Sequence, residues 1–256
     1  EKGLHRSLVG RVYRAGAILV RPERLAAYGA VVGDTASPVF PVTLIRELFV
    51  KLVDDPEFNG DLSRMVHGEQ VFSYRRPVRP WDLVSPRARV RGIEDKASGQ
   101  VLGLGQEIYC EGELLLEMET RLFFRGDARS EKPPGAGAPP ARPAPDTSFA
   151  VTGAPDFPKR YAEVSGDTNP IHLDEALARS VGFKGVIQHG LGTLALVVAK
   201  LPRPLSRLAV RFAKPVYPGE ALTTTVWRKG NALEFETANP AGDVVLANGQ
   251  ATVGAD

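Results

Sequence analysis

The stretch "LGTLALVVAKL", residues 191–201, decides the fold. It is apolar almost all the way round a helix, so it has no polar face for solvent and is predicted to be buried on every side. Pro202 ends it. Strand-like runs separated by turn residues follow it, namely "RLAVRFAKPV", "ALTTTVWRK", "ALEFETA" and "VVLANGQATV". A sheet wrapped around one buried helix satisfies this order, which predicts an α+β fold.

The same order of segments occurs earlier in the chain. Residues 24–35, "RLAAYGAVVGDT", resemble residues 159–168, "KRYAEVSGDT", with Tyr and Gly-Asp-Thr in the same register. Further on, "RRPVRPWDL" (75–83) resembles "AKPVYPGEA" (213–221). Two matches in the same order indicate an internal duplication.

We therefore expect two halves that are built alike. Each should begin with a strand (17–20 and 148–152), then form a short helix over its tyrosine, a longer helix (42–53 and 191–201) and a β-rich remainder. Residues 126–147, "GDARSEKPPGAGAPPARPAPDT", have almost no large apolar side chains, which is typical of a linker. The expected domains are residues 1–125 and 148–256.

The composition excludes several classes of protein. A net charge of +2 without any charged block gives no field for nucleic acid. The single cysteine, Cys110, excludes an internal disulfide and a cysteine-rich zinc site and fits a reducing cytosol. The apolar runs are too short to cross a bilayer, and no export signal precedes the first strand. We expect a cytoplasmic protein.

A second stretch, "SGDTNPIHLD" (165–174), carries candidate chemistry. Asn169 can cap a helical turn whose first residue is Pro170. His172 would then lie in that turn and Asp167 just before it, with both side chains facing one cleft. An acid and a base that converge on a water molecule suit general acid–base catalysis. The alternative is a capping aspartate beside a surface histidine.

The segment "QHGLGTLAL" (188–196) places Gly190 at the start of the buried helix. Free backbone N–H groups and the positive helix end at that position could bind a developing oxyanion. The alternative is that this glycine only eases a tight turn. For His189 we expect a packing or hydrogen-bonding role.

These residues resemble a known family. The whole hydratase signature of the MaoC-like, or (R)-specific enoyl-CoA hydratase, family is filled by Tyr161, Val164, Ser165, Gly166, Asp167, Asn169, Pro170, Ile171, His172 and Ala178. The segment "GFKGVIQHGLGTLAL" continues the pattern, with Leu191 where the family often has methionine. The first half, with "FPVTLIREL" and "HGEQVFSYRRPVRPWD", resembles the non-catalytic domain of two-part (3R)-hydroxyacyl dehydratases.

The resemblance implies a double hotdog, in which two curled antiparallel sheets join edge to edge and each wraps a central helix. It also implies reversible syn addition of water to a trans-2-enoyl thioester of CoA or acyl carrier protein, giving the (3R)-3-hydroxyacyl thioester. Carried over by position, Asp167 and His172 activate the water, Gly190 polarises the thioester carbonyl and Asn169 shapes the turn. A dimer of double hotdogs is the expected assembly.

The first half departs from this pattern. After Gly-Asp-Thr it lacks the stretch with Asn-Pro-Ile-His, so Asp34 has no histidine partner and we expect one catalytic site. We interpret His67 as structural and take Arg211 as a further candidate for substrate binding. No metal-ligand motif or dinucleotide-binding glycine motif occurs, so we expect neither a metal nor a redox cofactor.

Two other functions remain open at this point. A hotdog thioesterase would direct water at the carbonyl carbon, and a non-enzymatic acyl-binding subunit would need no acid–base pair. The acyl chain length, its branching or carboxylation, the carrier and the physiological direction are also open. The sequence does not settle which of Asp167 and His172 is the base.

Overall fold

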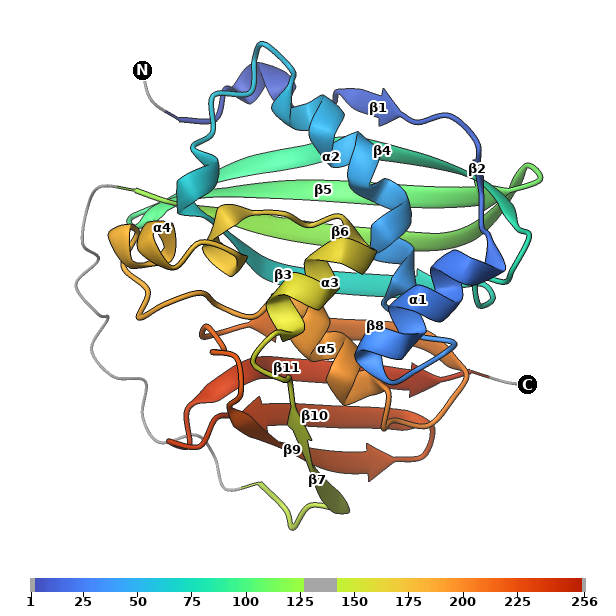
Figure 1. The fold of residues 1–256 in the computed structure, drawn as a ribbon. Helices are drawn as coiled ribbons and strands as arrows, with labels where there is room; N and C mark the ends of the chain where they lie inside the picture. The colour runs from blue at the N-terminus through green and yellow to red at the C-terminus, as the bar shows by residue number, and fades with distance from the viewer. Residues whose placement is uncertain (1–2, 127–141, 255–256) are drawn as a thin grey trace.

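The computed structural model describes residues 3–126 and 142–254, which include one 11-stranded sheet with helices against one face (Figure 1). The strands are β1 (Val12–Arg14), β2 (Ile18–Leu19), β3 (Met65–Tyr74), β4 (Leu83–Lys96), β5 (Gly99–Cys110), β6 (Glu113–Arg125), β7 (Thr147–Thr152), β8 (Leu205–Phe212), β9 (Ala221–Lys229), β10 (Ala232–Ala238) and β11 (Val244–Val253). The α-helices are α1 (Pro22–Val32), α2 (Arg46–Val53), α3 (Phe157–Ser165), α4 (Glu175–Ser180) and α5 (Gly190–Val198). Short 3₁₀ turns cover Arg6–Leu8, Phe40–Ile45, Leu62–Arg64 and Pro170–His172.

The order of the strands repeats about the middle of the sheet. It runs β1-β4-β5-β6-β3 through the first half and β8-β11-β10-β9-β7 through the second, with β2 paired to β4. The halves meet where β3 and β8 pair antiparallel, with Phe72 opposite Leu208. This is the α+β fold that the sequence predicts, arranged as the edge-to-edge double hotdog that the resemblance implies. The domain boundaries remain a prediction, and residues 127–141 of the expected linker lie outside the described residues.

The repeated Gly-Asp-Thr segments end equivalent helices. Gly33 after α1 and Gly166 after α3 both adopt left-handed backbone conformation, with φ of 74° and 76°. Only glycine takes this conformation without a steric cost, and it stops each helix just before its aspartate. The tyrosines of the two helices, Tyr28 and Tyr161, are buried and their hydroxyls hydrogen-bond to each other at 2.9 Å.

The longer helices differ from the expected ranges. Residues 42–53 form a 3₁₀ turn up to Ile45 and an α-helix only from Arg46. Pro41 and the β-branched residues after it disfavour regular α-helix, which explains the tighter first turn. In the second half α5 ends at Val198, three residues before the expected end at Leu201.

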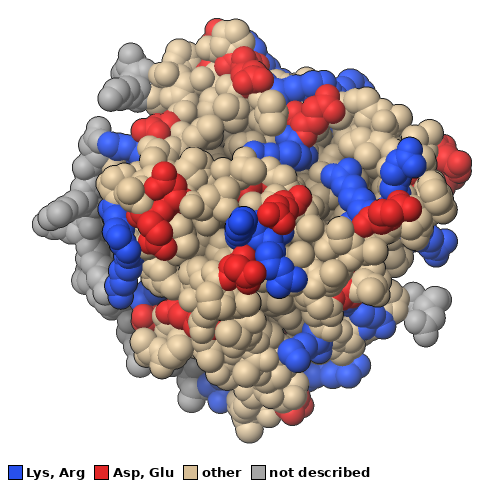
Figure 2. Space-filling view, in the orientation of Figure 1, with Lys and Arg blue, Asp and Glu red and all other residues tan. Residues whose placement is uncertain are grey.

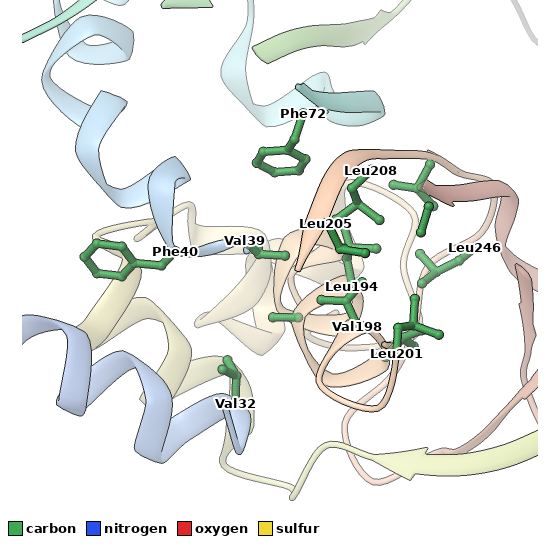
Figure 3. Packing of buried hydrophobic residues seen from close by; sticks show 14 of the residues in the cluster. Val32, Val39, Phe40, Phe72, Leu194, Val198, Leu201, Leu205, Leu208 and Leu246 are labelled. Carbon is green, nitrogen blue, oxygen red and sulfur yellow. The ribbon is translucent and has the colours of Figure 1, made fainter. Parts of the chain in front are cut away.

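The core is different in the two halves. One apolar cluster spans both, and Figure 3 shows Phe72 of β3 close to Leu208 of β8, with Leu194 and Val198 of α5 nearby. A second cluster, which includes Leu52, lies in the first half alone. Thus α5 is packed on all sides, as its sequence predicts, whereas the core of the first half is divided.

The surface carries charges of both signs. On the face in Figure 2, basic and acidic side chains are interspersed, as the net charge of +2 suggests. Among the described helices, none has the length and apolar character needed to cross a membrane.

Candidate active site

The turn after α3 is fixed by a series of local hydrogen bonds. Ser165 Oγ accepts from the Asp167 N–H at 3.1 Å, and Asp167 Oδ1 accepts from the Asn169 N–H at 3.2 Å. Asn169 Oδ1 then accepts from the Ile171 N–H at 3.2 Å, so Asn169 caps the turn that Pro170 begins, as the sequence predicts. The spacing therefore places the Asp167 carboxylate just before the turn that carries the buried His172.

The ring of His172 has a defined tautomer. Its Nδ1 lies 2.7 Å from the Ile187 carbonyl oxygen, which can only accept, so Nδ1 carries the proton. Nε2 therefore carries no proton and is an acceptor, with no hydrogen bond from the residues that the structure describes. Only 8% of the surface of this residue is exposed.

His189 lies directly against this ring. The two imidazoles stack with centroids 3.7 Å apart, and His189 Nε2 donates to the backbone carbonyl of Asp167 at 2.9 Å. Its Nδ1 is buried and has no hydrogen-bond partner among the described residues. His189 thus packs under His172 and ties the start of α5 to the aspartate turn, which agrees with the expected packing and hydrogen-bonding role.

Burial and nearby charge shift the pKa of each of these groups. Burial lowers the pKa of His172, against the opposing effect of the Asp167 carboxylate. Burial, together with His172, lowers the pKa of His189 to about 4. For Asp167, burial alone would raise the pKa, but the two histidines, the Asn169 N–H and Arg46 together hold it below its ordinary value. At neutral pH the site therefore holds a carboxylate and two neutral imidazoles.

Within the described part of the chain, one group of side chains has the ligand types of a metal site. One potential ligand atom from each of Asp167, His172 and His189 lies within 4.8 Å of the others. An imidazole binds a metal in its own ring plane, and the two stacked rings are only 24° apart. They are therefore poorly arranged to share one ion, whereas a carboxylate and a free imidazole nitrogen suit a hydrogen-bonded water.

The start of α5 completes this arrangement. Gly190 is its first residue, where backbone N–H groups have no partner within the helix. A Cβ atom at this position would lie 2.7 Å from Cδ1 of Phe212, so only glycine fits. The helix end therefore offers N–H donors beside the acid–base pair.

Two cavities meet at the aspartate. The larger cavity, about 330 Å³, lies mainly in the first half between α2 and strands β3 to β6. The smaller cavity, about 190 Å³, lies at the start of α5 and is lined by His172, Gly190 and Lys214. Both are lined by Met65, His67, Leu122, Asp167, Asn169 and Leu191. Asp167 is therefore among the residues at the boundary where the two cavities adjoin.

The first half contributes polar residues that the sequence analysis did not select. Arg46 begins α2, lines the larger cavity and stacks over Phe49, with the guanidinium carbon 5.3 Å from the ring centroid. Gln70, Gln106 and Thr120 are buried in the floor of the same cavity. The inward position of Gln70 could have been predicted from the sequence, because Gln70 lies two residues before the buried Phe72 and so on the same face of the strand.

Two other sequence expectations are changed by the structure. Arg211 is exposed on the outer face of β8, opposite Glu69, because its neighbours Val210 and Phe212 point inward, and it lines neither cavity. We therefore do not retain it as a substrate contact. His67, which was interpreted as structural, lines both cavities, and burial lowers its pKa to about 4.

Comparison with known proteins covers both halves. Residues 137–249 match the model of the MaoC like domain, and residues 35–126 match the model of the MFE-2 hydratase 2 N-terminal domain. The crystal structure of HtdX from Mycobacterium tuberculosis superposes with a TM-score of 0.79 and 26% identity, covering 96% of this chain and 100% of that one.

Sequence relatives agree with these matches. Peroxisomal multifunctional enzyme type 2 of Mus musculus is 31% identical over 91% of this chain, which spans only 34% of that longer protein. Enoyl-CoA hydratase ChsH3 of Mycobacterium tuberculosis is 31% identical over 76% of this chain and 72% of its own length. The two halves, the sheet and the aspartate–histidine turn therefore have one common explanation: the chain belongs to the MaoC-like hydratase 2 family.

Proposed function

We propose that the protein is an (R)-specific hydro-lyase that interconverts trans-2-enoyl thioesters and (3R)-3-hydroxyacyl thioesters. The observation that carries this proposal is the proximity of Asp167, which lines both cavities, to His172, which lines the smaller one: a ligand atom of each lies within 4.8 Å of the other, beside Gly190 at the start of α5. A carboxylate, an imidazole and a backbone oxyanion site are the groups that water addition to an enoyl thioester requires.

The protonation states define how the water is held. At neutral pH both the Asp167 carboxylate and His172 Nε2 are acceptors, so together they bind the two hydrogens of one water molecule. The water oxygen is then free to attack C3 of the substrate. As the water oxygen bonds to C3, one member of the pair takes a proton from the water. The same group then gives that proton to C2, which has gained the electron pair of the C2–C3 double bond, so one water molecule is added in full. Addition on one face, or syn addition, follows because both groups lie on one side of the substrate.

The thioester carbonyl needs its own partner during this step. Attack at C3 moves negative charge onto that oxygen, and the N–H groups at the start of α5 stabilise it. Gly190 lets the substrate oxygen approach the backbone, since a larger residue would collide with Phe212. Asn169 holds the turn, so we assign it a positioning role.

The cavities indicate how the substrate lies. The larger cavity has an apolar lining that includes Leu48, Phe49 and Leu52, which suits an acyl chain. The smaller cavity then takes the thioester and the start of its carrier, CoA or a carrier protein. The first half thus forms the acyl wall, and the second half, residues 148–256 as proposed from the sequence, holds the single catalytic site.

A thioesterase is the second enzyme class that this fold supports, because fold alone does not fix the reaction. A non-enzymatic acyl-binding subunit is the third. Two acceptors beside backbone N–H donors support the hydro-lyase over these alternatives, because they suit attack on one carbon with return of the proton to its neighbour. The experiment below distinguishes the three.

The test follows the enoyl-thioester absorbance of crotonyl-CoA and of longer trans-2-enoyl-CoAs on addition of the protein. We expect loss of absorbance, a (3R) product and no free thiol, with Asp167→Asn inactive. Release of thiol without hydration would indicate a thioesterase. Binding of the enoyl-CoAs without turnover in either protein would indicate an acyl-binding subunit.

We also propose that the protein forms a homodimer in a cytoplasmic compartment. Three exposed apolar side chains support self-association: Trp81, Leu83 and Leu19 are 59%, 50% and 38% exposed, and Leu19 pairs with Leu83 between β2 and β4. Sedimentation equilibrium of the wild type and of Leu83→Asp tests this, since a monomeric wild type would contradict it.

A further inference from the structure

The floor of the larger cavity contains a connected chain of polar side chains. His67 Nε2 lies 3.0 Å from Gln70 Oε1, which also accepts from the Thr120 hydroxyl at 2.9 Å. Gln106 Nε2 donates to Thr120 Oγ1 at 2.9 Å. Gln70 and Thr120 are direct cross-strand partners on β3 and β6. We call Gln70, Thr120 and Gln106 the polar band.

The polar band is buried in an otherwise apolar wall. Gln70, Gln106 and Thr120 are only 1%, 4% and 6% exposed. Leu104 and Leu122 flank them on the same strands and line the same cavity. Buried polar groups cost free energy unless each is hydrogen-bonded, so a cavity intended only for a hydrocarbon chain would be lined more stably by apolar residues.

The band also has unused hydrogen-bonding capacity. Because Gln70 Oε1 accepts from both His67 and Thr120, the amide nitrogen keeps its two N–H groups, and it has no partner among the described residues. The Thr120 hydroxyl has one proton, and donating it to Gln70 leaves Gln106 Oε1, 3.3 Å away, without it. The band therefore has one amide nitrogen with two unused N–H groups, and one acceptor oxygen, to spare.

The second half provides a contrast. There Thr224 and Thr237 are fully buried on the inner face of the sheet and hydrogen-bond to each other at 2.8 Å. They line neither cavity. A buried polar pair in this sheet can thus satisfy its own hydrogen bonds. The polar band, which does not, lines the cavity where a ligand would lie.

We propose that the polar band is a subsite for a neutral oxygen, a hydroxyl or keto group, on the acyl chain of the enoyl thioester. This rests on the proposed function and narrows its substrate class. A hydroxyl oxygen would accept from Gln70 Nε2 and donate to Gln106 Oε1, and a keto oxygen would accept from Gln70 alone. A carboxylate would lack a cation there, because Arg46 lies on the aspartate side of the cavity, against Gly166.

The experiment compares kcat/KM for trans-2-enoyl-CoAs of one chain length. One substrate is unsubstituted, and the others bear a hydroxyl group that moves carbon by carbon along the distal chain, with a keto and a terminal carboxylate analogue. We expect the wild type to prefer one hydroxyl position over the plain chain by roughly tenfold, the effect of supplying partners to buried polar groups.

The variants Gln70→Met and Thr120→Val remove the band at similar side-chain volume. In both, the ratio of kcat/KM between the preferred hydroxylated substrate and the plain one should fall towards unity. Thr224→Val is the matched control, since it removes a buried, hydrogen-bonded threonine outside both cavities, and its ratio should equal that of the wild type.

Several results would overturn the inference. The first is a wild type whose kcat/KM is higher for the unsubstituted substrate than for the hydroxylated one, wherever the hydroxyl group stands. The second is a higher kcat/KM for the carboxylate analogue than for every hydroxylated substrate. The third is a ratio of kcat/KM, hydroxylated to plain, that equals the wild-type ratio in both Gln70→Met and Thr120→Val. The scan of positions with the wild type decides the matter even if a variant does not fold. Failure of the proposed function gives a different result, because then no enoyl-CoA of the series is hydrated.

Discussion

The same helix–glycine–aspartate segment has different surroundings in the two halves. In the second half Asp167 lies next to two neutral histidines and opens onto both cavities. In the first half Asp34 instead forms an ion pair with Arg203, which follows α5 of the other half. The same backbone segment thus occurs in both halves, and the residues that approach its aspartate determine whether that aspartate is reactive or structural.

The largest expected difference between the halves is in activity. Asp167→Asn removes the carboxylate that holds the water, so kcat for hydration should fall by about 10³-fold. Asp34→Asn changes the equivalent residue of the other half and should leave kcat at the wild-type level. Both are measured with crotonyl-CoA. A comparable loss in Asp34→Asn would mean that the halves are not functionally distinct.

Stability at acid pH should depend on both halves. His67 and His189 have native pKa values near 4, whereas an unfolded histidine titrates near its ordinary value. The unfolded state therefore binds protons first as the pH falls, and the free energy of unfolding should decrease between about pH 6.5 and 4, by about 3 kcal/mol for each histidine.

Urea unfolding at a series of pH values measures this decrease. His67→Asn should remove about half of the dependence, and the remainder should belong to the second half. A free energy of unfolding that is constant over this pH range would contradict the burial of neutral histidines in either half.

The Asp34–Arg203 pair should matter for stability alone. Arg203 also donates to the carbonyls of Ala36 at 2.8 Å and Val198 at 3.0 Å, so it joins the end of α5 to the first half. Arg203→Met should lower the free energy of unfolding by about 2 kcal/mol, since a partly buried carboxylate and two carbonyls lose their partner. A double-mutant cycle with Asp34→Asn separates the ion pair from the carbonyl bonds. Coupling near zero would show that the pair is not a link between the halves.

The smallest expected effect is that of a first-half residue, Arg46, on the pKa of Asp167 in the active site. The positive charge of Arg46 helps to hold the pKa of Asp167 below its ordinary value. In Arg46→Met the acid limb of the kcat/KM profile should move to higher pH by about half a unit. Arg211→Met removes an exposed arginine that lines neither cavity and is the control. Equal profiles for both variants would rule out this influence.

The sequence predicts features whose causes are local. The all-apolar helix, the repeated Gly-Asp-Thr segment and the spacing of Asp167, Asn169 and His172 depend on neighbours within a few residues. His67, Gln70 and Arg46 reach the cavities only because β3 joins β8 and α2 lies over the sheet, and no short pattern encodes this. The outward position of Arg211 is also a local feature, because the alternation along a strand turns it away from its inward-facing neighbours Val210 and Phe212.

The seam between β3 and β8 has a consequence for how such a protein can change over time. Expressed as separate chains, each half would present this strand as a bare edge, ready to pair with another copy. A single chain fixes a one-to-one stoichiometry and pairs this edge in every molecule, so the two halves need not be alike, and only the second has the Asn-Pro-Ile-His turn. A substitution at the seam differs from one elsewhere, because it alters the packing of both halves at once.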